Sequence, residues 1–219
     1  MTQSDLEKFT EKMEESISEP SDSDGEWKLK NIEDVCVLNP GSINDDNFDY
    51  EEIQYLEISN SGDGFIEELE EYNINNAPSR AKRTVSEGHS VISTVRPNRE
   101  HYVFIEDVPE NLVVSTGFAV LYPKNPDQIR PKYLYYVLTH PIFIDYLDAN
   151  ATGSAYPAVN LDIIKKGVVP IPDRETQENI VDTLGVFDSK IKQNVKEIKK
   201  LREMRNILIP EVLPPEKME

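Results

Sequence analysis

The chain has 219 residues, of which 38% are hydrophobic, and it carries a formal net charge of −18. This length allows one domain of ordinary size with an appendage, and the low apolar fraction still permits a core. The single cysteine, Cys36, excludes an intramolecular disulfide, which is typical of a reducing cytoplasm. No apolar run approaches the roughly 20 residues that span a bilayer, and the acidic N-terminus is unlike a secretory signal, so we expect a cytoplasmic protein without a membrane partner.

The negative charge is concentrated in the first third of the chain. Residues 1–76 hold 22 acidic and 4 basic side chains, whereas residues 77–219 hold 19 of each. Polyphosphate binding normally needs a basic surface, so the charge of the whole chain argues against a nucleic-acid partner. Because residues 77–219 are neutral overall, a local basic face is still compatible with the sequence.

Residues 1–25 are polar and acidic, and this composition predicts a disordered tail. Order is expected to begin at Trp27. A second interpretation is a docking helix for a partner, because four apolar residues of the tail share one helical stripe: Leu6, Phe9, Met13 and Ile17.

Short runs rich in β-branched and aromatic residues follow, separated by turn residues. Ser61 to Gly64 is turn chemistry and predicts a hairpin into Phe65 and Ile66. The spacing predicts a mostly antiparallel, curved sheet. Its expected strands are residues 35–38, 53–58, 90–95, 102–105, 112–115 and 118–122.

The pattern changes to helical after Pro131, which suits the first turn of a helix. A second helix is expected from Pro141 to Leu147, a third at Leu161 to Lys165, and then a short strand from Gly167 to Ile171. We therefore predict an α+β domain over residues 26–172, in which helices pack on a mixed or antiparallel sheet.

A long helix is expected over residues 173–209, with Asp173 as its N-cap and a tail at 210–219 that begins with Pro210. Its apolar residues recur at spacings of three and four, which is the pattern of a coiled coil. An amphipathic helix packed on its own domain is the alternative, but the charged flanks favour the coiled coil. The seam consists of Leu184, Phe187, Ile191, Asn194, Ile198, Leu201, Arg205 and Leu208.

The sequence lacks the residue combinations of an enzyme. The three histidines, His89, His101 and His140, are scattered and have no metal-ligand spacing. Neither of the two glycine-rich phosphate-binding patterns, G-x-x-x-x-G-K and G-x-G-x-x-G, is present. We therefore expect a chain that is not catalytic and that binds no metal or cofactor of its own.

Three segments have side chains suited to DNA. The first is the basic cluster Arg80, Lys82 and Arg83, which suits phosphate contact, although a solvated turn is the simpler interpretation. The second is the loop after the strand at 90–95, where arginine can bind guanine and asparagine can bind adenine. Its candidates are Ser93, Thr94, Arg96, Asn98, Arg99, His101 and Tyr102, and a surface network of these arginines with Glu106 and Asp107 is the alternative.

The third segment is A-T-G-S-A-Y-P-A-V-N at 151–160. Thr152, Ser154 and Tyr156 are hydrogen-bonding residues around Gly153, which permits close approach of a backbone. The alternative is a structural turn before the long helix. We expect this segment to be a secondary contact, and Pro170, Pro172 and Gln177 beyond it to have a structural role.

These pieces resemble the specificity subunit of type I restriction-modification systems. The stretches that carry the resemblance lie between Glu26 and Leu208, and the last two are the most specific. They are E-W-K-L-K-N-I-E-D-V from Glu26, R-T-V-S-E-G-H-S-V-I-S-T-V-R-P at 83–97, V-V-S-T-G-F-A-V-L at 113–121, P-K-Y-L-Y-Y-V-L at 131–138, A-T-G-S-A-Y-P-A-V-N at 151–160 and V-P-I-P-D-R-E-T-Q-E-N-I at 169–180.

The resemblance implies a non-catalytic subunit with two target recognition domains, each followed by a spacer helix. Each domain reads half of a bipartite site in double-stranded DNA. The subunit recruits modification subunits that methylate adenine and a restriction subunit, and these partners use S-adenosylmethionine, ATP and Mg²⁺.

This sequence has one such domain and one helix, so it is similar to a half-subunit. A half-subunit would pair with itself or with another half-subunit. The second interpretation is an acidic protein-interaction module, or an inactive truncated remnant, that antagonises a restriction-modification complex.

Overall fold

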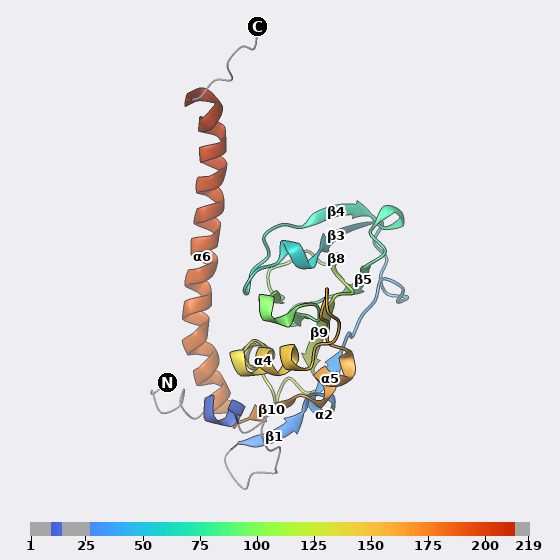
Figure 1. Cartoon of the computed structure of the whole chain (residues 1–219), viewed down its shortest axis with the longest axis vertical. Coiled ribbons are helices and arrows are strands. Elements are labelled where there is room, and N and C mark those ends of the chain that lie inside the picture. The colour runs from blue at the N-terminus through green and yellow to red at the C-terminus, as the bar shows by residue number, and fades with distance from the viewer. Residues whose placement is uncertain (1–9, 15–26, 213–219) are drawn as a thin grey trace. The chain divides into compact units, whose positions relative to one another are not determined.

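The β-branched and aromatic runs build three separate sheets in the computed structural model, which describes residues 10–14 and 27–212 (Figure 1). The chain divides into two compact units, residues 1–181 and residues 182–219. All three sheets belong to the first unit. The single curved sheet expected from the sequence is therefore divided, although the α+β class with a long C-terminal helix is confirmed.

The first four-stranded sheet is antiparallel throughout. Its strands lie in the order β2 (Cys36–Leu38), β9 (Phe118–Pro123), β6 (Ser90–Ser93) and β7 (Tyr102–Phe104).

The second four-stranded sheet is mixed, because β3 and β8 run parallel. Its order is β4 (Glu70–Asn73), β3 (Glu52–Leu56), β8 (Leu112–Ser115) and β5 (Ala81–Thr84).

A two-stranded sheet joins the start of the domain to its end. In it β1 (Lys28–Asn31) pairs antiparallel with β10 (Val168–Ile171). The short helix α2 (Ile32–Val35) follows, and the backbone N–H of Ile32 donates to the carbonyl of Gly167 at 2.8 Å. Ordered structure around Trp27 thus depends on residues more than 130 positions later in the chain.

The main core contains residues of both four-stranded sheets. Val91 of β6 and Phe118 of β9 share one buried cluster with Leu56 of β3 and Val114 of β8. Because side chains alternate along a strand, the neighbouring Ile92 points to the other face of its sheet, where helix α3 (Pro131–Leu138) packs against β6. Strand β6 is therefore buried on both faces, and all four of its residues are buried, the two serines included.

The helices begin and end close to their expected positions. After α3 come α4 (Pro141–Ala149), α5 (Leu161–Lys166) and α6 (Arg174–Val212). Asp173 is the N-cap of α6, as predicted, because its Oδ1 accepts from the backbone N–H of Thr176 at 2.8 Å. The helix extends to Val212, three residues beyond the end expected at 209.

The second unit, as far as the structure describes it, is the part of α6 after Val181. Its apolar stripe is open to solvent: the five seam residues Phe187, Ile191, Ile198, Leu201 and Leu208 are between 48% and 62% exposed. Leu184 is half-buried, and the polar seam residue Asn194 is exposed. Pairing of this stripe with a second helix stays a prediction. Within the described residues, no helix combines the length and the apolar character needed to cross a membrane.

Some expectations for the N-terminal half were wrong. Residues 53–58 form a strand only to Leu56, after which Ile58–Asn60 is a 3₁₀ turn. The expected hairpin at Ser61 is reduced to a single antiparallel bridge between Ser61 and Ile66. Strands β1, β4 and β5 were not foreseen, because two of the four residues in each strand are charged.

The acidic tail is not wholly without structure. Residues 10–14 are helical, and the side chain of Met13 is fully buried. This part of the expected docking stripe is therefore covered by the chain itself. The other stripe residues, Leu6, Phe9 and Ile17, lie outside the described residues, as does most of the predicted tail.

Candidate nucleic-acid interface

Two segments that the sequence singled out separately form one structure. The loop after β6 and the segment between α4 and α5 are joined by an antiparallel bridge between Val95 and Ala158. On either side of it, the N–H of Arg96 donates to the carbonyl of Pro157 and the N–H of Val159 donates to the carbonyl of Thr94, both at 2.8 Å. The candidate contact loops therefore lie side by side at the C-terminal end of β6.

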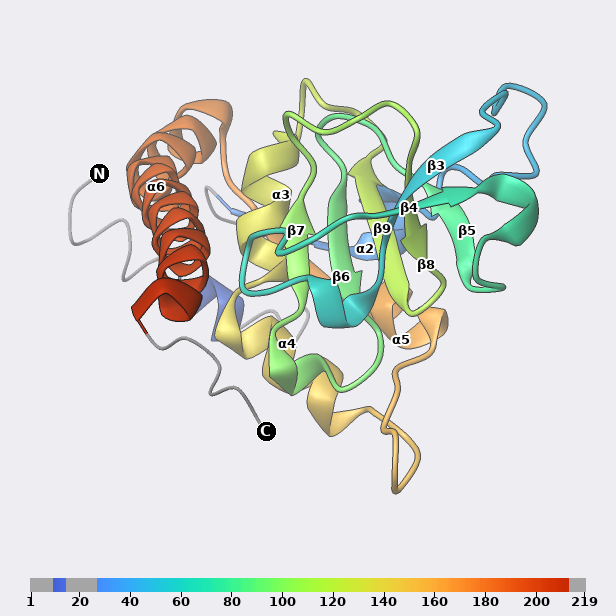
Figure 2. The same ribbon diagram turned by 90° about the horizontal axis from the view of Figure 1, so that it is seen from above.

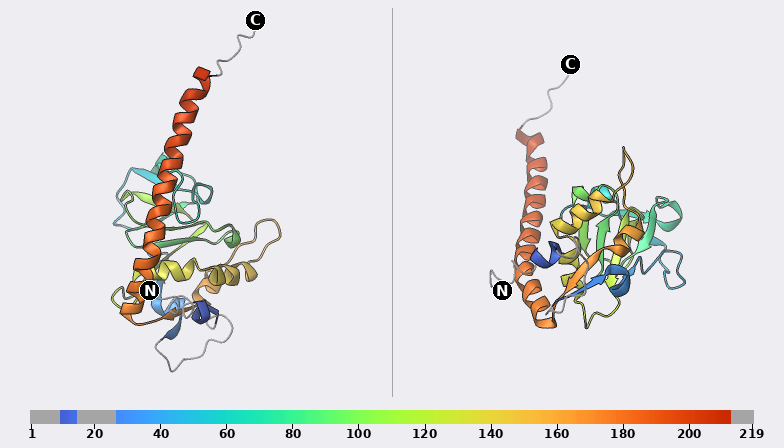
Figure 3. Two further views of the ribbon diagram at one scale, coloured as in Figure 1. Left: turned by 90° about the vertical axis from the view of Figure 1, so that its left-hand side faces the viewer. Right: turned by 60° about the horizontal axis from the view of Figure 1, so that its bottom comes forward.

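The segment from 151 to 158, which we name the finger, projects from the first unit between α4 and α5 (Figures 2 and 3). Its base is closed by reciprocal backbone hydrogen bonds of 2.9 Å between Thr152 and Ala158. Gly153 has a φ of +106°, and a Cβ there would lie 3.1 Å from the carbonyl oxygen of Tyr156. A glycine is thus required at position 153. Tyr156, on the same turn, is 73% exposed.

The Arg96 side chain is bound to the finger. Its Nη2 donates to the carbonyl of Ala155 at 2.7 Å, and its guanidinium carbon lies 4.7 Å from the centroid of the Tyr156 ring. The guanidinium that the sequence predicted to read guanine therefore contacts the finger. The alternative network with Glu106 and Asp107 does not form, since Glu106 pairs with Lys132 at 3.8 Å instead.

Asn98 and Arg99 are exposed on the 3₁₀ turn η3 (Pro97–Arg99) beside the finger. The amide of Asn98 donates weakly to Asp148 of α4, at 3.4 Å. In the described part of the chain, no hydrogen bond or ion pair involves the Arg99 guanidinium. Arg99 is therefore the basic side chain of this loop that is available to a ligand.

Four other candidates in the loop serve the fold. Ser93, Thr94 and Tyr102 are buried. The Ser93 hydroxyl donates to the carbonyl of Val95, and the Thr94 hydroxyl donates to the carbonyl of Gly117, both at 2.8 Å. The His101 ring is half-buried, with Nδ1 2.6 Å from the carbonyl oxygen of Ser61. The strand ends turn these side chains toward the protein in this structure, and base contact by them stays a prediction.

Two members of the basic cluster, Lys82 and Arg83, lie on strand β5, whereas Arg80 lies on the turn just before it. Arg80 lies at the same end of the domain as the finger. Its carbonyl accepts from the N–H of Thr116 at 2.9 Å, and the carbonyl of the next residue, Gly117, accepts from the N–H of Thr94 at 2.8 Å. Lys82 follows on the strand, half-buried. Arg83 is half-buried as well, its Nη1 lacks a hydrogen-bond partner, and burial lowers the pKa of its guanidinium. Arg80 is thus the member of the cluster best placed for phosphate contact.

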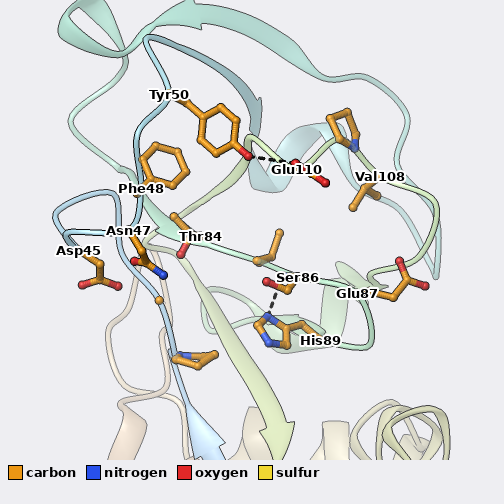
Figure 4. A pocket seen from close by; sticks show the side chains of 14 residues that line it. Asp45, Asn47, Phe48, Tyr50, Thr84, Ser86, Glu87, His89, Val108 and Glu110 are labelled. Carbon is orange, nitrogen blue, oxygen red and sulfur yellow. Dashed lines mark hydrogen bonds between the residues drawn. The ribbon is translucent and has the colours of Figure 1, made fainter.

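A cavity of about 740 Å³ lies beyond the other end of β6 (Figure 4). Asp45, Glu87 and Glu110 line it, and none of its fourteen lining residues is lysine or arginine. His89 also lines it, accepting from the N–H of Ser86 at 3.1 Å, and burial lowers the pKa of this imidazole. Carboxylates without basic residues repel phosphate, so we do not assign this cavity to DNA.

Two observations on the described residues concern metal binding and thiol reactivity. No three of their His, Cys, Asp or Glu side chains are grouped so as to hold a metal ion. Burial raises the pKa of the Cys36 thiol to about 12, against the smaller opposing effect of Lys124, so the thiolate nucleophile is not formed near neutral pH.

The family comparison covers most of the chain. Residues 24–203 match the family described as the type I restriction modification DNA specificity domain. The type I restriction enzyme HindI specificity subunit of Haemophilus influenzae is 29% identical over 154 residues, which are 68% of this chain and 33% of that protein.

Solved structures share the fold. The HsdS subunit from Thermoanaerobacter tengcongensis matches with a TM-score of 0.65 and 22% identity over 92% of this chain and 53% of that one. A chain from a structural study of complex assembly and conformational transition of the type I R-M system matches with a TM-score of 0.66 and 21% identity, over 91% and 52%. The chain thus spans between a third and about half of these relatives. It belongs to the type I restriction-modification DNA specificity domain family.

Proposed function

We propose that this chain is a non-catalytic DNA recognition module that reads one half of a bipartite site. The observation that carries the proposal is the convergence of three segments at one end of the first unit. Backbone hydrogen bonds connect Arg80 to the turn after β8, that turn to Thr94, and Thr94 to the base of the finger. Family membership supports DNA as the ligand.

The chemistry of this end fits a division of labour between phosphate and base contacts. Arg80 and Arg99 are exposed cations, and the finger adds the exposed hydroxyls of Thr152 and Ser154. Phosphate contacts fix the register of a protein on the duplex, whereas side chains at base edges carry the sequence information. Arg99 with Asn98 is the pair whose donors match guanine and adenine in the major groove.

The test is selection of bound sequences from a random duplex library by the full chain, followed by titration of the selected duplex at several salt concentrations. Binding should weaken steeply as salt rises. We expect Arg99→Ala to cost about 1–3 kcal/mol at one base position, and Arg80→Ala to lower the salt slope by about 1 for all sequences. Lys28→Ala is the matched control, since Lys28 is exposed on β1, in the two-stranded sheet that contains none of the three converging segments. Failure to enrich any sequence would overturn the proposal.

The finer proposal is that two copies of this chain, or this chain and another half-subunit, pair through the exposed stripe of α6. The seam from Leu184 to Leu208 is roughly 36 Å long at about 1.5 Å per residue, close to the roughly 34–36 Å of one DNA turn. A homodimer would then present two readers to an interrupted palindrome. Light scattering at micromolar concentration should give a dimer, and Ile191→Glu should dissociate it. If the wild-type chain is a monomer both with and without the duplex, the proposal of pairing through α6 is wrong.

The assembled reader would recruit modification subunits that methylate adenine and a restriction subunit. This chain contributes no cofactor chemistry to that reaction, and the partners would supply S-adenosylmethionine, ATP and Mg²⁺. Methylome sequencing with and without the chain tests the recruitment. Loss of adenine methylation at one bipartite sequence is the expected result, and an unchanged methylome contradicts it.

The acidic cavity beyond β6 favours one second candidate, an interaction module that antagonises such a complex. Asp45, Glu87 and Glu110 would offer carboxylates to a basic surface that otherwise binds phosphates. The duplex titration separates the two functions. A DNA reader binds with a steep salt slope, whereas an acidic antagonist does not bind the duplex at all.

A further inference from the structure

The finger and the loop after β6 are joined by side chains as well as by backbone, and the Arg96 side chain makes a hydrogen bond and a cation–π contact across this junction. Its guanidinium spans the carbonyl of Ala155, at 2.7 Å, and the ring of Tyr156, at 4.7 Å. A base could use only the N–H donors that Ala155 does not take, on a guanidinium that is already held against the finger. We infer, on the basis of the proposed function, that Arg96 is a positioning residue and that Tyr156 is the residue of the finger that contacts DNA.

The backbone holds Arg96 in this role. Its φ of +49° and ψ of 64° lie in the left-handed region, which costs free energy for a residue with a Cβ. The conformation is imposed from both sides, by the buried ring of Pro97 and by the hydrogen bond from the Arg96 N–H to Pro157. The main chain at Arg96 is therefore fixed, and the guanidinium is held against the finger. The Arg96 side chain thus loses little further conformational entropy when DNA binds.

The exposed ring is the natural contact. One face of Tyr156 carries the Arg96 guanidinium, and the side chain is nevertheless 73% exposed, far more than a ring that stabilises a core. Aromatic rings offer a flat apolar surface that stacks on bases or wedges between base steps, and a cation over the opposite face adds to the attraction for a nucleic acid. Contact through the ring face, and not through the hydroxyl, is the chemistry that this geometry supports.

The inference predicts that the effects of Arg96 and Tyr156 on DNA binding are not additive. Tyr156→Ala should weaken binding of the selected duplex about tenfold, the usual scale for removal of one stacking ring. Arg96→Ala should cost a similar factor, because the ring loses its support. The double variant should also lose about tenfold, not a hundredfold. Tyr156→Phe should recover most of the loss of Tyr156→Ala, since phenylalanine keeps the ring face.

A spectroscopic readout separates contact from folding. Tyr156→Trp places an indole on the finger, and its emission should change when the selected duplex is added. Arg96→Ala in that background should reduce the change at saturating duplex. All of these variants should keep the wild-type circular dichroism and melting temperature, because both side chains lie outside the core.

The outcomes divide cleanly. A tenfold further loss on Arg96→Ala in the Tyr156→Ala background would mean that Arg96 touches DNA itself, and the inference would be overturned while the proposed function stands. Wild-type binding by Tyr156→Ala would overturn it too. Failure of the wild-type chain to bind any duplex would overturn the proposed function, and the inference with it.

Discussion

The sharpest stability prediction concerns Gln177 in the second turn of α6. This side chain is fully buried, and it makes three hydrogen bonds to backbone groups. Its Oε1 accepts from the N–H of Arg130 at 2.9 Å, and its Nε2 donates to the carbonyls of Gln128 at 2.9 Å and Pro172 at 3.0 Å. It thus ties the start of α6 to the segment before α3.

Gln177→Ala removes all three bonds and leaves three backbone groups without this partner in a buried or partly buried setting. At about 1 kcal/mol for each net bond, and more where the abandoned group cannot reach water, the loss is roughly 3–5 kcal/mol. A unit of this size loses about 2–4 °C in Tm for each kcal/mol, so the expected decrease is roughly 6–20 °C.

Gln177→Glu adds a pH signature. An ionised carboxyl there would face the carbonyl oxygens of Gln128 and Pro172, both of which need a donor. The protonated form alone can donate, so the pKa of the introduced group should be raised in the folded state. A raised pKa gives stability at low pH that is lost as pH rises above the unfolded value, about 4.3. The variant should therefore melt closer to wild type near pH 4 than at pH 7.

Thermal unfolding followed by circular dichroism from pH 4 to pH 8 measures both effects. Gln193→Glu is the matched control, because Gln193 is exposed on the same helix and its Oε1 accepts from Lys190 at 3.3 Å. This control should melt within about 1 °C of wild type, as expected for an exposed substitution. Equal Tm values for Gln177→Glu and Gln193→Glu at pH 7 would refute the reasoning.

Three further predictions concern single groups. Burial lowers the pKa of His89, so stability should fall as pH drops below about 6.5, and His89→Asn should reduce that slope in a Tm-against-pH series; an unchanged slope contradicts this. Cys36, with its pKa raised to about 12, should react with a thiol reagent at pH 8 only after denaturant is added. Gly153→Ala should weaken duplex binding as Tyr156→Ala does, because φ is +106° there and the added Cβ meets the Tyr156 carbonyl; wild-type affinity would count against a rigid finger.

The sequence predicts the elements whose own residues decide their structure. Strand β6 and helix α3 have strong local patterns and lie where they were expected. Strand β5 does not, since A-K-R-T carries two basic side chains and becomes a strand only through its pairing with β8. The same holds for β1, which depends on β10 at the far end of the domain. These strands come from long-range pairing, which composition does not reveal.

The candidate site shows the same limit. Both loops were expected to contact DNA, but their pairing rests on backbone groups of Thr94, Arg96 and Pro157, which no residue pattern encodes. Arg96 illustrates this limit, because its guanidinium contacts Ala155 and Tyr156, and the sequence identified neither residue as its partner.

At the candidate site, the backbone bonds that place the loops are distinct from the exposed side chains that would contact DNA. Most hydrogen bonds that join Arg80, the turn after β8, the loop after β6 and the finger are between main-chain atoms, and the Thr94 and Arg96 side chains add one each. The main-chain bonds form with almost any side chain, so they do not constrain the exposed residues between them. Asn98, Arg99 and Ser154 can therefore be replaced without loss of the joints that place them. Because the same joints would hold different side chains against the DNA, substitution at these exposed positions should change which sequence is selected while Tm stays within about 2 °C of wild type, as is usual for surface positions.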